Sequence, residues 1–210
     1  MASPITLRWR IHEGVLPLRQ RHMRALNRLG LTEALIGWIH ERLEWAMLNM
    51  LETSTEAVLV LSIDPAAEVR LSLEEVQPAP QLNTSDLCIK QGRVTGIYSA
   101  GQLLAGDVWL AQDGQLLAST DEVYTATSTL CQDLATTLGV RVLVEPQVLS
   151  AVQQAAGLGK AFLIVDEFGF IPISQSQEPV STSYTATNIP INSTSSSITE
   201  RIRQAFARLW

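Results

Sequence analysis

The sequence comprises 210 residues, of which 46% are hydrophobic and 17% charged, with a formal net charge of −6. This apolar content suffices for one sizeable core or two small ones, and it excludes a chain that is disordered throughout. The cysteines and histidines lack the spacing of metal ligands or of a disulfide framework, so we predict no metal and a cytoplasmic protein. Neither a membrane-spanning run nor a signal-peptide core is evident.

The first 30 residues carry most of the positive charge. They contain six arginines and one acid, whereas the rest of the chain is acidic. Such a cationic front is either a solvated face or a docking site for an anionic partner. Nucleic acid is not expected, because no RNA-binding signature with interleaved aromatic residues accompanies the arginines. The candidate partner-binding residues are Arg19, Arg21, Arg24 and Arg28.

The N-terminal part reads as strands and helices of a small α/β unit. Apolar residues recur every three or four positions between Leu35 and Leu51, which is the spacing of a helix that buries one face. Alternation after Asp64-Pro65 indicates a hairpin. In chain order we expect a strand over 5–10, helices over 22–29 and 32–52, and strands over 58–63 and 69–73.

The later part alternates strands and helices. Asp113-Gly114 is suited to a tight hairpin turn, and Gly139 and Gly157 are placed to end helices. We expect strands over 87–90, 107–111, 115–117, 140–144 and 162–165, and helices over 121–138, 146–156 and 198–210.

Two features divide the chain. Pro78 and Pro80 interrupt regular structure, and the stretch before the last helix is rich in serine and threonine. We therefore expect an α/β protein with a small α/β domain over 1–80, a larger α/β domain over 81–175, a flexible loop over 176–197 and a C-terminal helix over 198–210.

Several short phrases, in the right order, resemble the class IV aminotransferases, the PLP fold type IV family. Residues 16–26 resemble its "His-x-x-Arg-Leu" helix and residues 113–118 its "Asp-Gly-x-Ile-x-Glu" hairpin. Residues 134–142 match its "Leu-Ala-x-x-Leu-Gly-Ile-x-Val" junction, and residues 161–173 match its late strand pair. The resemblance implies a shortened, two-lobed fold with a cofactor cleft between a small α/β sandwich and a larger α/β lobe.

The same resemblance supplies candidate site residues. Lys90 stands where the family carries the lysine that bonds PLP; in a cleft its amine could attack an aldehyde, whereas at a strand end it could simply be a surface residue. Thr127 and Ser128 begin a helix whose N–H groups could contact a phosphate. Arg24 is adjacent to Ala25, the position of the family's phosphate-binding arginine.

Other family positions depart from the pattern. The carboxylate that contacts the pyridine nitrogen of PLP falls on Ala118, and the Thr-Asn phosphate-binding pair falls on Ile164 and Val165, which offer no side-chain donors. Asp166 and Glu167, directly after that strand, suit either acid–base chemistry or a solvated turn. The histidines, His22 among them, are expected to be surface or packing residues.

These departures favour a degenerate class IV aminotransferase-like protein that is non-catalytic, binds no cofactor and serves as a binding or structural subunit. Its partner would be another protein or a second copy of the chain. The alternative is an active PLP-dependent aminotransferase or aminodeoxychorismate-type lyase that uses Lys90.

Overall fold

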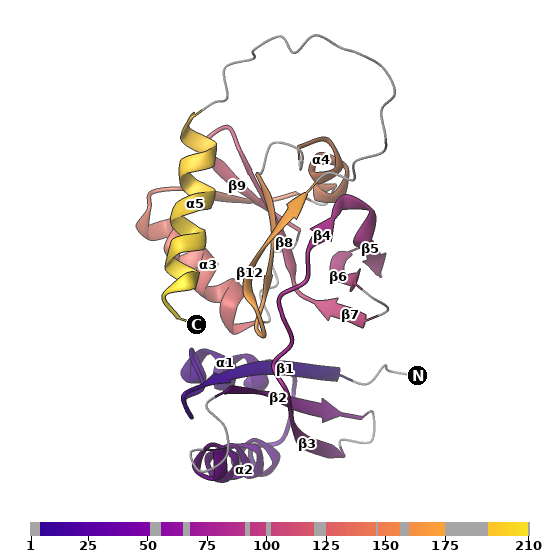
Figure 1. Cartoon of the computed structure of the whole chain (residues 1–210), viewed down its shortest axis with the longest axis vertical. Helices are drawn as coiled ribbons and strands as arrows, with labels where there is room; N and C mark the ends of the chain where they lie inside the picture. Colours follow the sequence, from indigo (N-terminus) through magenta and orange to yellow (C-terminus); the bar gives the residue numbers. More distant parts are fainter. Residues whose placement is uncertain are drawn as a thin grey trace.

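The computed structural model describes most of the chain in two lobes, one above the other in Figure 1. The described residues are 5–50, 56–64, 68–90, 93–99, 102–119, 125–145, 147–155, 160–174 and 193–209. Most of the Ser/Thr-rich segment expected to be a flexible loop lies outside them.

The N-terminal lobe (residues 5–74) is a three-stranded antiparallel sheet with helices against it. The sheet order is β1-β2-β3, and α2 lies below it in Figure 1. Ile39 and Leu43 of α2 pack on Leu59 and Leu61 of β2, so the periodicity of the sequence does mark the buried face. The elements are β1 (Ile5–His12), α1 (Arg19–Asn27), α2 (Glu33–Met50), β2 (Glu56–Ile63) and β3 (Val69–Glu74).

The C-terminal lobe (residues 82–209) is built on a six-stranded mixed sheet, ordered β10-β9-β8-β11-β12-β4. A second sheet, β5-β6-β7, lies beside it. The strands are β4 (Leu82–Asn83), β5 (Leu87–Lys90), β6 (Arg93–Ser99), β7 (Gln102–Ala105), β8 (Asp107–Gln112), β9 (Gln115–Ala118), β10 (Arg141–Val144), β11 (Ala161–Val165) and β12 (Gly169–Ser174). The helices are the 3-10 turn Thr84–Asp86, α3 (Ala126–Thr137), α4 (Val148–Ala155) and α5 (Ser193–Ala207).

The central strand β11 is buried on both faces of the six-stranded sheet. Phe162 and Ile164 pack on the side of α3 and α5, while Leu163 and Val165 pack on the side of α4. A strand covered on both faces reads as a continuous apolar run, as this one does in the sequence. The fold is therefore α/β, as the sequence predicts.

The structure also corrects details of the predicted elements. The last helix begins at Ser193, earlier than the expected residue 198, because the serine-rich segment before it already has helical backbone. The first helix begins at Arg19 rather than at residue 22, and strands β6 and β7 were not predicted. The Asp113-Gly114 turn is confirmed: both residues have positive φ, 50° and 77°, as a type I′ hairpin requires.

Gly106, between β7 and β8, lies where a side chain would meet the backbone of β11. A Cβ atom there would be 2.6 Å from the Ile164 carbonyl oxygen and 2.8 Å from the Val165 Cγ2. We expect Gly106→Ala to lower the free energy of unfolding by about 1–3 kcal/mol because the strand must move. Chemical denaturation measures the effect.

Gly37, on the exposed side of α2, is the matched control, since a Cβ atom there would meet nothing within 4 Å. Gly37→Ala should raise the free energy of unfolding by about 0.5–1 kcal/mol, because alanine favours a helix. Equal effects of the two substitutions would contradict the close approach of β8 and β11.

Candidate functional site

The site lies where α1 of the N-terminal lobe meets the first turn of α3. Thr125 is the N-cap of α3, and its hydroxyl oxygen accepts a hydrogen bond from the Ser128 N–H at 3.1 Å. Thr127 and Ser128 are fully buried. The helix therefore begins inside the protein, where its free N–H groups need partners.

Asp166, in the turn after β11, provides the main partner. Its Oδ1 accepts hydrogen bonds from both the backbone N–H of Thr127, at 2.9 Å, and the Thr127 hydroxyl, at 2.7 Å. The positive end of the helix dipole also favours a carboxylate at this place. Asp166 thus binds the start of α3 as an external anion would.

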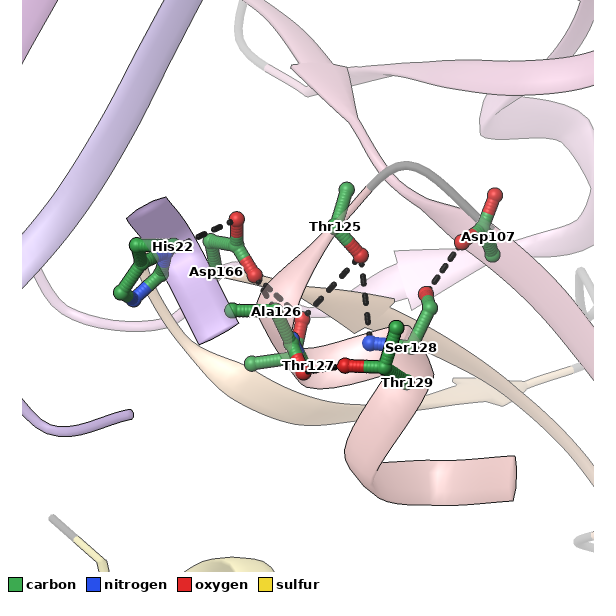
Figure 2. Close-up of polar contacts among 8 residues, drawn as sticks. All are labelled: His22, Asp107, Thr125, Ala126, Thr127, Ser128, Thr129 and Asp166. Atoms are coloured by element: carbon green, nitrogen blue, oxygen red, sulfur yellow. Dashed lines mark hydrogen bonds and ion pairs between the residues drawn. The ribbon is translucent and has the colours of Figure 1, made fainter. Parts of the chain in front are cut away.

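The other oxygen of the same carboxylate faces α1. The His22 Nδ1 lies 3.4 Å from Asp166 Oδ2, and the imidazole is fully buried with its ring 4.7 Å from that of Trp9. Figure 2 shows His22 and Thr127 on either side of Asp166. One carboxylate therefore joins the two lobes.

The environment of Asp166 favours its ionised form. Burial raises the pKa of this carboxyl, but the nearby imidazole of His22 together with the two hydrogen bonds from Thr127 outweighs it, so the pKa lies below its usual value. The carboxylate is thus negatively charged near neutral pH.

The other polar groups around the start of α3 are also paired within the chain. The Ser128 hydroxyl donates to the carboxylate of Asp107, which begins β8 (Figure 2). The Thr129 hydroxyl donates to the Ala126 carbonyl at 2.7 Å. The side chains of Ser128 and Thr129 are therefore hydrogen-bonded to other groups of the chain.

A second carboxylate joins the lobes beside the first. Glu167, 2% exposed, accepts hydrogen bonds from Arg8 of β1, with Nε at 2.6 Å and Nη2 at 3.3 Å. The hydrogen bond to Glu167 is the main cause of a raised pKa for Arg8, and Glu74 adds a further contact. Asp166 and Glu167 are therefore buried ion-pair partners and not a solvated turn.

Comparisons with known proteins now bear on this geometry. No family profile matches the sequence, and no curated protein is similar to it in sequence. The structure is similar to 4-amino-4-deoxychorismate lyase from Pseudomonas aeruginosa, with a TM-score of 0.55, 14% identity and coverage of 96% of this chain and 90% of that one. It is also similar to branched-chain amino acid aminotransferase from Thermobaculum terrenum in its PLP form, with a TM-score of 0.55, 11% identity and coverage of 99% and 86%.

The chain has the class IV aminotransferase fold. The fold expected from the resemblance is thereby confirmed. Identities this low establish the fold and leave the chemistry to be argued from the residues of this chain.

The residues of the class IV fold around α3 do not fit the phosphate group of PLP. The donors of Thr127 are already bonded to Asp166, and Ile164 and Val165 are buried and apolar. Ala118, at the position of the family's carboxylate, is 2% exposed and offers only a methyl group. The donors at the start of α3 are instead bonded to a carboxylate of the chain itself, that of Asp166.

The structure brings only some of the candidate residues together. Thr127 and Ser128 are buried in the first turn of α3, and Arg24, exposed on α1, lines a pocket together with Thr129 of that turn. Lys90 ends β5, with its backbone opposite Arg93 of β6, and its side chain is outside the described part of the structure. Strand β5 and helix α3 pack on different core clusters.

The arginines of the cationic front also have definite places. Arg19 bonds His40, at 2.8 Å, and Glu44, both on α2. Arg21 pairs with Asp133 of α3 at 2.7 Å. Part of the front therefore holds the chain's own elements together.

The roles of His22 and Asp166 are not evident from the sequence, because their partners are distant along the chain. Among the described residues, no group of three or more His, Cys, Asp or Glu side chains could hold a metal ion. None of the described helices has the length and apolar composition that crossing a membrane requires.

Replacing Asp166 tests the contact at α3. We expect Asp166→Asn to lower the free energy of unfolding at neutral pH by about 1–3 kcal/mol, because it removes the charge that the buried donors and His22 attract. The matched control is Asp133→Asn, whose side chain is 65% exposed and which should change stability by less than about 1 kcal/mol. Equal losses in the two variants would contradict the account.

The Arg8–Glu167 pair allows a second test. A double-mutant cycle with Arg8→Gln and Glu167→Gln should give a coupling of about 1–3 kcal/mol, because Glu167 is buried. The control cycle uses Arg203 and Glu200 of α5, which form the same two-point contact in solvent, and its coupling should be clearly smaller. A coupling at Arg8–Glu167 no larger than that control would contradict a buried link between the lobes.

Proposed function

We propose that this protein is a non-catalytic relative of the class IV enzymes that binds no PLP and acts as a binding or structural subunit. The observation that carries the proposal is the position of Asp166, whose carboxylate accepts hydrogen bonds from the backbone N–H and the hydroxyl of Thr127. A cofactor phosphate would need those donors.

Electrostatics strengthens this argument. A phosphate brought to the start of α3 would lie beside the ionised Asp166. Two like charges about 4 Å apart repel by about 4 kcal/mol at the effective dielectric constant of a protein site. Removing Asp166 from its place would instead leave Thr127 and His22 without their partner. Both routes oppose occupancy by a phosphate.

The surface supports an interaction role. Trp45 and Leu48 of α2 are 62% and 64% exposed, and Trp38, on the same face, is 36% exposed with Arg42 over its ring. Tryptophan is enriched where proteins contact one another. Arg24 of α1, which is exposed, adds positive charge for an acidic partner.

The same proposal includes the domain division near residue 80 and a cytoplasmic location. Cys131, on α3, is a free cysteine that is fully buried in the protein core. Burial raises the pKa of its thiol, so the thiol stays protonated and unreactive. A reducing compartment suits such a residue.

Titration of the purified protein with PLP tests the proposal. We expect neither a visible-range absorbance of lysine-bound cofactor nor, after borohydride reduction, a modified Lys90. Lys90→Ala should behave as the unaltered protein does in this assay. An absorbance that borohydride fixes on Lys90 and that Lys90→Ala abolishes would overturn the proposal in favour of an active PLP-dependent aminotransferase or lyase.

A further inference from the structure

Helix α2 presents an apolar stripe on the side that faces away from the sheet. Ile39 and Leu43 are buried against the sheet, whereas Trp38, Trp45 and Leu48 are 36%, 62% and 64% exposed. Positions 38, 45 and 48 lie along one side of a helix. Figure 1 shows α2 at the end of the molecule, below the sheet of the N-terminal lobe. The described part of the chain therefore leaves this stripe uncovered.

An acidic and a basic residue stand in the middle of the stripe. Glu41 and Arg42 follow each other between the two tryptophans, and both are exposed. Among the described residues Glu41 has no hydrogen-bond or ion-pair partner. Arg42 lies over the ring of Trp38, with 5.5 Å between its guanidinium carbon and the ring centroid. Both charges are thus accessible to a partner at this face.

The order of these residues is symmetric about the midpoint between Glu41 and Arg42. Trp38 precedes Glu41 by three positions, and Trp45 follows Arg42 by three. In a two-fold interface, if residue i of one copy contacts residue j of the other, then j also contacts i. Two antiparallel copies of α2 that cross at this midpoint would place Trp38 opposite the partner's Trp45 and Glu41 opposite the partner's Arg42, each pair twice.

We propose that α2 packs antiparallel on α2 of a second copy of this chain, in a two-fold dimer. Charge favours this occupant and this direction: antiparallel copies join opposite charges, whereas parallel copies would join Glu41 with Glu41 and Arg42 with Arg42. Aromatic side chains at the centre of such a contact bury a large area and anchor it. The inference names a partner for the proposed binding subunit and rests on that proposal.

Analytical ultracentrifugation of the full chain, over a range of concentrations and without PLP, tests the proposal. A face one helix long is smaller than the interfaces of about 1,200–2,000 Å² that hold stable complexes, so we expect a dimer that dissociates on dilution. In NMR spectra the indole N–H signals of Trp38 and Trp45 should shift as the dimer forms. A chain that stays monomeric at every concentration would overturn the proposal and would indicate that a different protein covers α2.

Two truncations locate the interface. Trp45→Ala should weaken dimerisation about tenfold or more, because a central aromatic anchor is lost from both copies. Val144→Ala shortens a side chain that is 48% exposed on β10, in the other lobe, and should leave dimerisation unchanged. Equal dimerisation of the two variants would place the interface elsewhere and overturn the proposal.

Exchanging the central charges tests the antiparallel direction. Glu41→Arg alone and Arg42→Glu alone each place like charges opposite one another and should weaken dimerisation. The double variant, Glu41→Arg with Arg42→Glu, restores opposite charges and should dimerise more tightly than either single variant. A double variant no better than the single ones would overturn the antiparallel pairing. Since PLP is absent from these measurements, their failure is distinct from a failure of the PLP titration.

Discussion

The arrangement of the two lobes depends on a buried carboxylate with a neighbour on each side. Asp166 accepts two hydrogen bonds from Thr127 with one oxygen and faces His22 with the other. Burying a charge is costly, and the cost is offset only where hydrogen bonds and an opposite charge surround it. In the turn after β11, Asp166 lies between the start of α3, which donates these hydrogen bonds, and His22 of α1.

Other charged residues of the chain also form contacts between the two lobes. Arginines of β1 and α1 meet carboxylates of the C-terminal lobe through Arg8 with Glu167 and Arg21 with Asp133. Charges that look like a docking surface in the sequence are thus partly used within the protein.

The fold was largely predictable from the sequence because local patterns determine it. Helical spacing between Leu35 and Leu51 located α2, and Asp113-Gly114 located the hairpin of β8 and β9. The site was less predictable. Asp166 follows its strand as a turn residue would, and only the packing of α1 and α3, distant in sequence, makes it a buried anion. Strands β6 and β7 lacked a clear alternation of apolar and polar residues.

The most direct test of the central claim is an NMR titration of the Asp166 carboxyl carbon, assigned by comparison with Asp166→Asn. Because the folded pKa lies below that of the unfolded chain, the ionised carboxylate stabilises the fold above the unfolded value of about 3.9, and this stabilisation is lost as the pH falls through the folded pKa. The account predicts a titration midpoint below the ordinary value, accompanied by a shift of the Thr127 amide. A midpoint at or above the ordinary value, with an unaffected Thr127 amide, would contradict it.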